Sequence, residues 1–427
     1  MNSKFQQELK ALNAADIISD DTLLRIQQYY NTNTKEKSNR LLPIFGVLGS
    51  LLVGLGLILI VAHNWDIFSR TTRTIWAFIP LLIGQFFVGF SLLKRKGKSW
   101  REASATFLII SIGVTISLVS QIYNIPGSFS TFLLSWILLA APVLYLMRSY
   151  AAALIYLFMI TIYAIEVGYF TGSKIPWLYI PLLLWAIPYY LIQLKKNAAK
   201  NSLGILNWLF PISLAIVLGA FIPNSEHLAL LIYTLLFGTL YLVSKFPLFS
   251  KQKLITNGYA AVGSLGTVCT LSFGTFMGFW ESSYHQIIHT PSLLIVISGI
   301  LLGLGLLAYL YKNKLLALNN LFGTAFLVFA IVFLFRGEDP YIPTILSNFL
   351  LFGLGISAIH LGSKHLQYST LNYGLLIITL QITYRFFDTE ISFVIRGVLF
   401  ILIGLGFFLT NYILFRKQRI ALKQETH

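Results

Sequence analysis

Residues 41–63 read LLPIFGVLGSLLVGLGLILIVAH, a run without a single Asp, Glu, Lys or Arg. The hydrocarbon core of a bilayer is about 30 Å thick, so a spanning helix needs about 20 mostly apolar residues. Comparable apolar stretches recur along the whole chain. The predicted spans are 41–63, 73–93, 103–122, 130–147, 150–170, 176–194, 202–222, 227–244, 254–279, 291–311, 315–335, 342–361, 366–385 and 391–415. The sequence therefore predicts an all-α fold, a polytopic transmembrane helix bundle of about 14 spans.

The charge of the chain supports this class and gives an orientation. Only 11% of the residues are charged, whereas a soluble domain has about 25%, so a soluble globular protein is excluded. The net charge of +16 would suit nucleic acid, but 25 of the 31 Lys and Arg residues fall in the termini and alternate loops on one side. The remaining six are Arg70, Arg73, Lys174, Arg336, Arg385 and Arg396. Because positive charge stays in the cytoplasm, we expect a multi-pass inner (cytoplasmic) membrane protein with both termini cytoplasmic, membrane lipids as partners and no nucleic-acid partner.

The first 40 residues are polar and form a separate segment. Phe5, Leu9 and Leu12 recur at helical spacing, as do Leu23, Ile26 and Tyr30, and Ser19 is a good N-cap for the second helix. We expect a cytoplasmic helical hairpin at 1–40, a transmembrane domain at 41–415 and a basic cytoplasmic tail at 416–427. Two short helices bury little surface, so residues 1–40 are expected to dock on a protein partner or on a second copy of the chain. No cleavable signal peptide is expected, and the first span is the predicted insertion signal.

Glycine motifs indicate an internal repeat in the second half of the chain. Gly-Leu-Gly occurs at 303–305, 353–355 and 404–406, and each of the first two copies is followed by a similar Asn- and Gly-containing segment. Copies separated by an even number of spans insert in the same direction, so the sequence predicts parallel hairpin repeats. Transporters often contain such symmetry. Close helix packing is the simpler explanation of the glycines themselves.

One segment resembles a known family. The sequence Gly54-Leu55-Gly56-Leu57-Ile58-Leu59 is followed by Ala62-His63-Asn64-Trp65-Asp66 and then by Arg70 and Arg73. This pattern resembles the uncharacterised bacterial membrane-protein family called domain of unknown function 2157. The N-terminal hairpin and the segment from Asn372 to Gly404 are also similar to it, whereas 223–290 match nothing known to us. The resemblance implies a polytopic bacterial inner-membrane protein and no established activity or ligand.

Polar residues gather in the predicted outer loops. The first and last outer loops both carry charged residues at helix ends, where apolar residues would be cheaper to insert. The predicted outer-face polar cluster consists of His63, Asp66, Arg70, Arg73, Arg385 and Asp388. Arginine suits phosphate or carboxylate because of its forked donors, so the cluster could bind an anionic headgroup, a sugar or a carboxylate. The alternative is a set of interfacial anchors and loop ion pairs.

Three other groups could carry chemistry. Glu166 is an acid inside a predicted span, and such acids are functional candidates for binding a proton or a cation. Glu281, His285 and His289 are spaced four apart, which is a weak zinc pattern in a loop that need not be helical, so no metal site is expected. The amides Gln85, Gln121, Gln381 and Asn207 are expected to form hydrogen bonds between helices.

These observations narrow the range of possible functions without identifying one. Walker A, dinucleotide-binding, Cys-x-x-Cys and Gly-x-Ser-x-Gly motifs are absent from the sequence, so we expect no cofactor and lean against an enzyme. The first hypothesis is a secondary transporter or lipid-handling protein. The alternatives are a membrane-embedded enzyme acting at the outer face on a lipid-linked or periplasmic substrate, and a structural or sensory protein whose cytoplasmic hairpin binds a partner.

Overall fold

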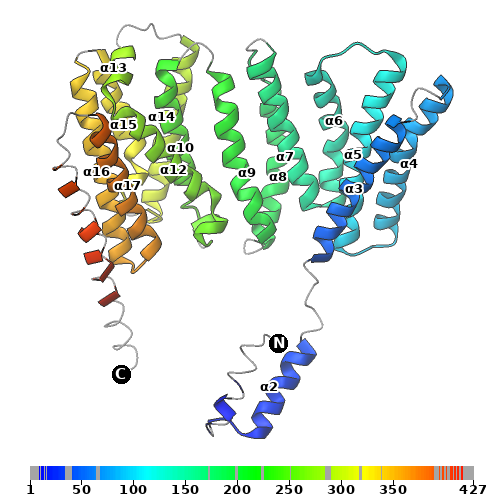
Figure 1. Cartoon of the computed structure of the whole chain (residues 1–427), viewed down its shortest axis with the longest axis horizontal. Helices are drawn as coiled ribbons and strands as arrows, with labels where there is room; N and C mark the ends of the chain where they lie inside the picture. Colours follow the sequence, from blue (N-terminus) through cyan, green and yellow to red (C-terminus); the bar gives the residue numbers. More distant parts are fainter. Residues whose placement is uncertain are drawn as a thin grey trace. The chain divides into compact units, whose positions relative to one another are not determined.

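The computed structural model is all-helical in the part of the chain that it describes (Figure 1). The described residues are 9, 11–13, 15, 17–33, 41–63, 68–171, 174–197, 201–222, 226–250, 252–283, 290–316, 320–337, 339–388 and single residues or short pieces between 394 and 416. The chain divides into two compact units. Unit 1 comprises Met1–Pro126 and Leu139–Ala152, and unit 2 comprises Gly127–Leu138 and Ala153–His427.

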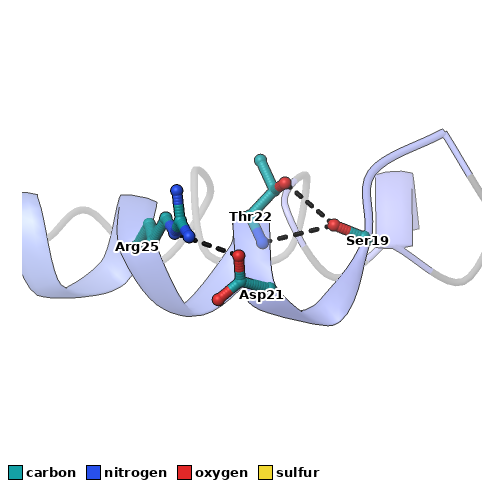
Figure 2. Close-up of polar contacts among 4 residues, drawn as sticks. All are labelled: Ser19, Asp21, Thr22 and Arg25. Carbon is teal, nitrogen blue, oxygen red and sulfur yellow. Dashed lines mark hydrogen bonds and ion pairs between the residues drawn. The ribbon is translucent and has the colours of Figure 1, made fainter.

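The N-terminal segment contains helix α2 (Asp20–Asn33). The Ser19 hydroxyl accepts a hydrogen bond from the Thr22 N–H at 3.4 Å, and Asp21 pairs with Arg25 at 3.0 Å (Figure 2). Ser19 therefore caps this helix as the sequence predicts. Leu9 from the preceding helical residues is only 4% exposed, whereas Leu12 is 39% exposed, and the side chains of Phe5 and Tyr30 lie outside the described residues. The seam between the two helices stays a prediction.

Unit 1 is built around one central helix. Helices α3 (Leu41–His63) and α4 (Arg70–Leu93) both pack against α5 (Lys98–Tyr123). Small residues allow these contacts: a Cβ on Gly84 would lie 3.1 Å from the Leu108 backbone. The Thr115 hydroxyl of α5 donates to the Ala77 carbonyl of α4 at 2.9 Å. Helices α6 (Phe129–Met147) and α7 (Tyr150–Ile165) each continue from one unit into the other.

Unit 2 contains the remaining helices. They are η3 (Glu166–Phe170), α8 (Tyr179–Asn197), α9 (Asn201–Leu218), η4 (Gly219–Phe221), α10 (Glu226–Val243), α11 (Pro247–Ser250), η5 (Leu254–Thr256), α12 (Gly258–Gly274), α13 (Met277–Ser283), α14 (Thr290–Lys312), η6 (Leu321–Gly323), α15 (Ala325–Leu334), η7 (Phe335–Gly337), α16 (Tyr341–Lys364) and α17 (Tyr368–Asp388). Phe326 of α15 is completely buried between Gly238 of α10 and Gly303 of α14, where a Cβ on either glycine would collide with its ring. This ring joins three helices in the core of the unit.

The glycines of the Gly-Leu-Gly motifs have unequal roles. Helices α16 and α17 lie side by side (Figure 1) and cross closely, because a Cβ on Gly374 would lie 2.6 Å from the Gly355 carbonyl oxygen. Gly303 accommodates Phe326, whereas Gly305 has no neighbour within 4 Å of the position of a Cβ. Close packing thus explains Gly303 of the first motif and both glycines of the second, since a Cβ on Gly353 would lie 3.2 Å from the Leu321 side chain. The parallel repeat itself stays a prediction.

Seven helices of the described chain are long and apolar enough to cross a membrane, and Ile44–Gly56, Leu228–Val243 and Ala325–Gly337 are shorter apolar helices. The count of about 14 spans stays a prediction, and two of the predicted spans differ from the structure. The predicted span 254–279 instead breaks after Gly274, because Trp280 of α13 turns back into the core and donates to the Gly274 carbonyl at 2.7 Å. The predicted span 315–335 becomes a short helix that begins only at Ala325. Most of 391–415 lies outside the described residues.

Candidate functional site

The connection from α3 to α4 brings two predicted site residues, Arg70 and Arg73, to the start of α4. The Arg70 guanidinium lies 4.6 Å from the centroid of the Tyr123 ring, and the Tyr123 hydroxyl lies 3.2 Å from that of Thr74. The Arg73 Nε donates to the Phe68 carbonyl at 2.9 Å. No acid lies in the first turn of this helix. The two arginines are thus held at one helix end, an arrangement that suits an anion.

The other members of the predicted outer-face cluster are placed only in part. His63 is the last residue of α3, while Arg385 and Asp388 lie in the last turn of α17, and their side chains fall outside the described residues. Asp66 is outside the described chain altogether. Arg70 and Arg73 belong to unit 1 and α17 to unit 2. The outer-face cluster therefore stays a prediction.

Glu166 stands at a change in helix type. The α-helical turns of α7 end at Ile165, and Glu166 begins the π-helical segment η3. The Thr171 hydroxyl donates to the Glu166 carboxylate at 3.2 Å and to its backbone carbonyl at 2.8 Å. Gly168 within this segment approaches Ala220 so closely that a Cβ would collide. Because π-helical turns occur frequently at functional sites, the geometry strengthens Glu166 as a candidate.

The weak metal pattern gains no support. Glu281 is exposed on α13, and His285 and His289 lie outside the described residues. Within the described part of the chain, no group of three His, Cys, Asp or Glu residues could hold a metal ion.

A buried acid that the sequence did not single out is Glu102 of α5, which is 4% exposed. The Ser149 hydroxyl and the N–H groups of Tyr150 and Ala151 donate to its carboxylate, the last two at 3.1 and 2.9 Å. Glu102 thus caps the N-terminus of α7 from a neighbouring helix, where the helix dipole favours a negative charge. The sequence does set Glu102 apart, because it is the only acid between Arg70 and Ala152.

Unit 2 contains a buried amide network between α12, α16 and α17. The Asn348 Nδ2 donates to the Thr275 carbonyl at 3.2 Å and to the Thr344 carbonyl at 2.8 Å. The Gln381 Nε2 donates to the Asn348 carbonyl at 2.7 Å and approaches its Oδ1 at 3.3 Å. This confirms the expectation that Gln381 bonds between helices. Asn207 of α9 also bonds between helices, since it accepts a hydrogen bond from the Tyr190 hydroxyl of α8, and its Nδ2 donates to Gln252 Oε1 at 2.7 Å.

The amide network leaves oxygen atoms without donors. Asn348 Nδ2 and Gln381 Nε2 both point at oxygen atoms only. These contacts fix which end of each side-chain amide is the nitrogen and which is the oxygen. Gln381 Oε1 and the hydroxyl of Ser347 are buried and have no hydrogen-bond partner. Ser347 is 0% and Gln381 is 6% exposed. We call Ser347, Asn348 and Gln381 the acceptor cluster; they lie on the neighbouring helices α16 and α17, and two of their oxygen atoms, Gln381 Oε1 and Ser347 Oγ, have no hydrogen-bond partner.

Comparisons with known proteins add a family and no activity. Neither a curated protein nor a solved structure matches the chain. Residues 10–153 match the model of a family described as "Predicted membrane protein (DUF2157)". This range includes the His-Asn-Trp-Asp motif, Glu102 and the start of α7, whereas the C-terminal similarity lies beyond it and stays a prediction. The resemblance is thus confirmed over residues 10–153, which are similar to the DUF2157 predicted membrane proteins.

Proposed function

We propose that this membrane protein is a secondary transporter and that the acceptor cluster of unit 2 is its solute site. The observation that carries the proposal is the pair of buried oxygens without donors, Gln381 Oε1 and Ser347 Oγ. Both lie on helices that form the apolar bundle, α17 and α16. Transporters commonly bind their solute between helices in the interior of the membrane domain.

Buried oxygen atoms without hydrogen-bond partners destabilise the folded protein. A buried acceptor without a partner costs about 1–3 kcal/mol, and a bilayer core provides no water to replace the missing donor. Replacing Ser347 by Ala would remove one such cost without leaving a large cavity. Both oxygens gain partners if a bound solute donates to Gln381 Oε1 and either donates to or accepts from the Ser347 hydroxyl. The expected solute therefore carries hydroxyl, amine or other N–H and O–H groups.

Glu166 supplies a candidate for coupling transport to protons. It also belongs to unit 2 and lies in the candidate span Tyr150–Phe170. Its described hydrogen-bond partner is Thr171, a hydroxyl rather than a cation.

A cysteine-accessibility experiment tests the proposal. In a Cys269→Ala background, Ser347→Cys is treated with a water-soluble, membrane-impermeant thiol reagent applied to either side of the membrane. A transporter must open its site to water, so Cys at position 347 is expected to react even though Ser347 is buried in this conformation.

The matched control is Thr267→Cys in the same background. Thr267 is equally buried on α12, and its hydroxyl donates to the Gly263 carbonyl at 2.8 Å. The control should react much more slowly than position 347. Equal protection at both positions from both sides would mean a static polar network and would favour the structural or sensory alternative.

A second candidate function is lipid handling or enzymatic action at the outer face. It is favoured by Arg70 and Arg73, which stand at one helix end without an acid in its first turn. Under this proposal Arg70 and Arg73 bind an anionic headgroup or a carboxylate. The inner-membrane location and the cytoplasmic termini are part of both proposals.

A further inference from the structure

One end of unit 1 gathers basic residues from two turns of the chain. The first turn joins α4 to α5 and the second joins α6 to α7. The basic surface consists of Lys94, Arg95, Lys96, Lys98, Arg101 and Arg148. Four of these residues are exposed, and Lys96 and Arg101 are half-buried. This is the end of the helices that the charge distribution places in the cytoplasm.

Glu102 holds the two turns together without neutralising them. Its carboxylate accepts hydrogen bonds from Ser149, Tyr150 and Ala151, which directly follow Arg148. It is the only acid from Arg70 to Ala152, and it is buried. The buried acid therefore joins the basic turns, while the positive charge of their surface has no acid beside it in this part of the sequence.

An aromatic surface adjoins these cations. The Trp100 ring lies 5.9 Å from the Phe90 ring and 6.3 Å from the Phe87 ring. The Lys96 ammonium lies 5.0 Å from the Phe90 ring centroid and 5.7 Å from that of Trp100. Trp100 is exposed, and so is Phe86 one turn before Phe90. Tryptophan is enriched at the level of lipid headgroups, so a surface that combines cations with Trp100 and neighbouring apolar rings suits the membrane boundary.

We propose that this basic surface binds an anionic phospholipid of the cytoplasmic leaflet. The phosphate group would contact Lys94, Lys96 and the neighbouring cations, and an acyl chain would lie along Phe86, Phe90 and Trp100. Basic residues near the membrane attract anionic headgroups. The exposed aromatic rings favour a lipid over a soluble polyanion, because a soluble polyanion has no apolar part to cover them. This lipid site is in unit 1 and is independent of the solute site proposed in unit 2.

The test compares two charge-matched variants of the full chain in nanodiscs or detergent. Lys94→Gln with Lys96→Gln removes two charges from the basic surface. The control, Lys195→Gln with Lys196→Gln, removes two exposed charges from the last turn of α8. Native mass spectrometry then measures binding of phosphatidylglycerol and of phosphatidylcholine to each protein. All four positions bear exposed or half-buried side chains, so the variants are expected to fold.

The wild type should bind phosphatidylglycerol in preference to phosphatidylcholine. The first variant should bind phosphatidylglycerol about 10-fold or more weakly, because two lysines that attract the anionic headgroup are removed. The control should keep the wild-type affinity. A third variant, Trp100→Leu, should weaken phosphatidylglycerol binding without any change in charge. Equal losses in the two charge variants, or equal binding of the two lipids by the wild type, would overturn the proposal. So would a preference for a soluble polyanion such as heparin over phosphatidylglycerol.

Discussion

Removing the Glu102 carboxylate should destabilise unit 1 far more than removing an exposed acid. Three donors lose their acceptor in Glu102→Ala, namely the Ser149 hydroxyl and the N–H groups of Tyr150 and Ala151. A hydrogen bond to a charged group contributes about 1.5–3 kcal/mol, and the donors here are buried or partly buried. The Ser149 hydroxyl still caps the Ala152 N–H at 3.1 Å, so one cap of α7 remains. We expect the free energy of unfolding to fall by about 3–5 kcal/mol, because each buried donor left without an acceptor costs about 1–3 kcal/mol.

Two further variants divide this effect into its parts. Glu102→Gln keeps an acceptor oxygen but loses the charge that favours the N-terminus of α7, so we expect a loss of about 1–2 kcal/mol. Ser149→Ala removes one donor to Glu102 and the cap on Ala152, and should cost about 1–2 kcal/mol. Because Ser149 and Glu102 share a hydrogen bond, the double variant should lose less than the sum of the single variants.

The assay is unfolding in mixed micelles by SDS titration, followed by tryptophan fluorescence. Glu281→Ala is the control, since Glu281 is exposed on α13. The reasoning would be refuted if Glu102→Ala stayed within about 0.5 kcal/mol of the wild type, which is the range typical of surface substitutions.

Three other predictions concern packing, coupling and the outer face. Gly303→Ala should lower the unfolding free energy by about 1–3 kcal/mol because its Cβ would collide with the buried Phe326 ring, while Gly305→Ala, with no neighbour within 4 Å, should be near neutral in the same titration. Glu166→Gln should abolish the charge displacement that a pH jump produces on a solid-supported membrane, and Glu281→Gln should retain it; a signal unchanged by Glu166→Gln would remove the proton-coupling role. Arg70→Ala and Arg385→Ala should each abolish a cellular phenotype of the wild type at normal membrane abundance, whereas reduced abundance of both variants would indicate a structural role.

Hydropathy predicted the membrane helices because a bilayer sets their length and composition regardless of how they pack. It could not place the break after Gly274, since that break depends on Trp280, which is 0% exposed and buried against Phe329 and Phe333. The same holds for the π-helical turn at Glu166. These features follow from contacts between segments that are separate in the sequence.

The candidate sites were less predictable than the helices. The bonding role of Gln381 was expected, but its partner Asn348 lies 33 residues away and could not be identified without the fold. Glu102 was not predicted as a site residue because it stands one residue before the predicted span 103–122. The sequence around it is dominated by basic residues, and its burial depends on the fold. Arg70 and Arg73 were identified from charge alone, and their contacts with Tyr123 and Phe68 required the structure.

The most direct measurement is a cryo-EM map of the full chain in lipid nanodiscs, with cell extract added before purification in one sample and omitted from the other. The transporter proposal predicts non-protein density larger than a water molecule about 3 Å from Gln381 Oε1, strengthened in the sample with extract. A map in which Gln381 Oε1 and Ser347 Oγ contact only protein atoms or a single water, with or without extract, would contradict it.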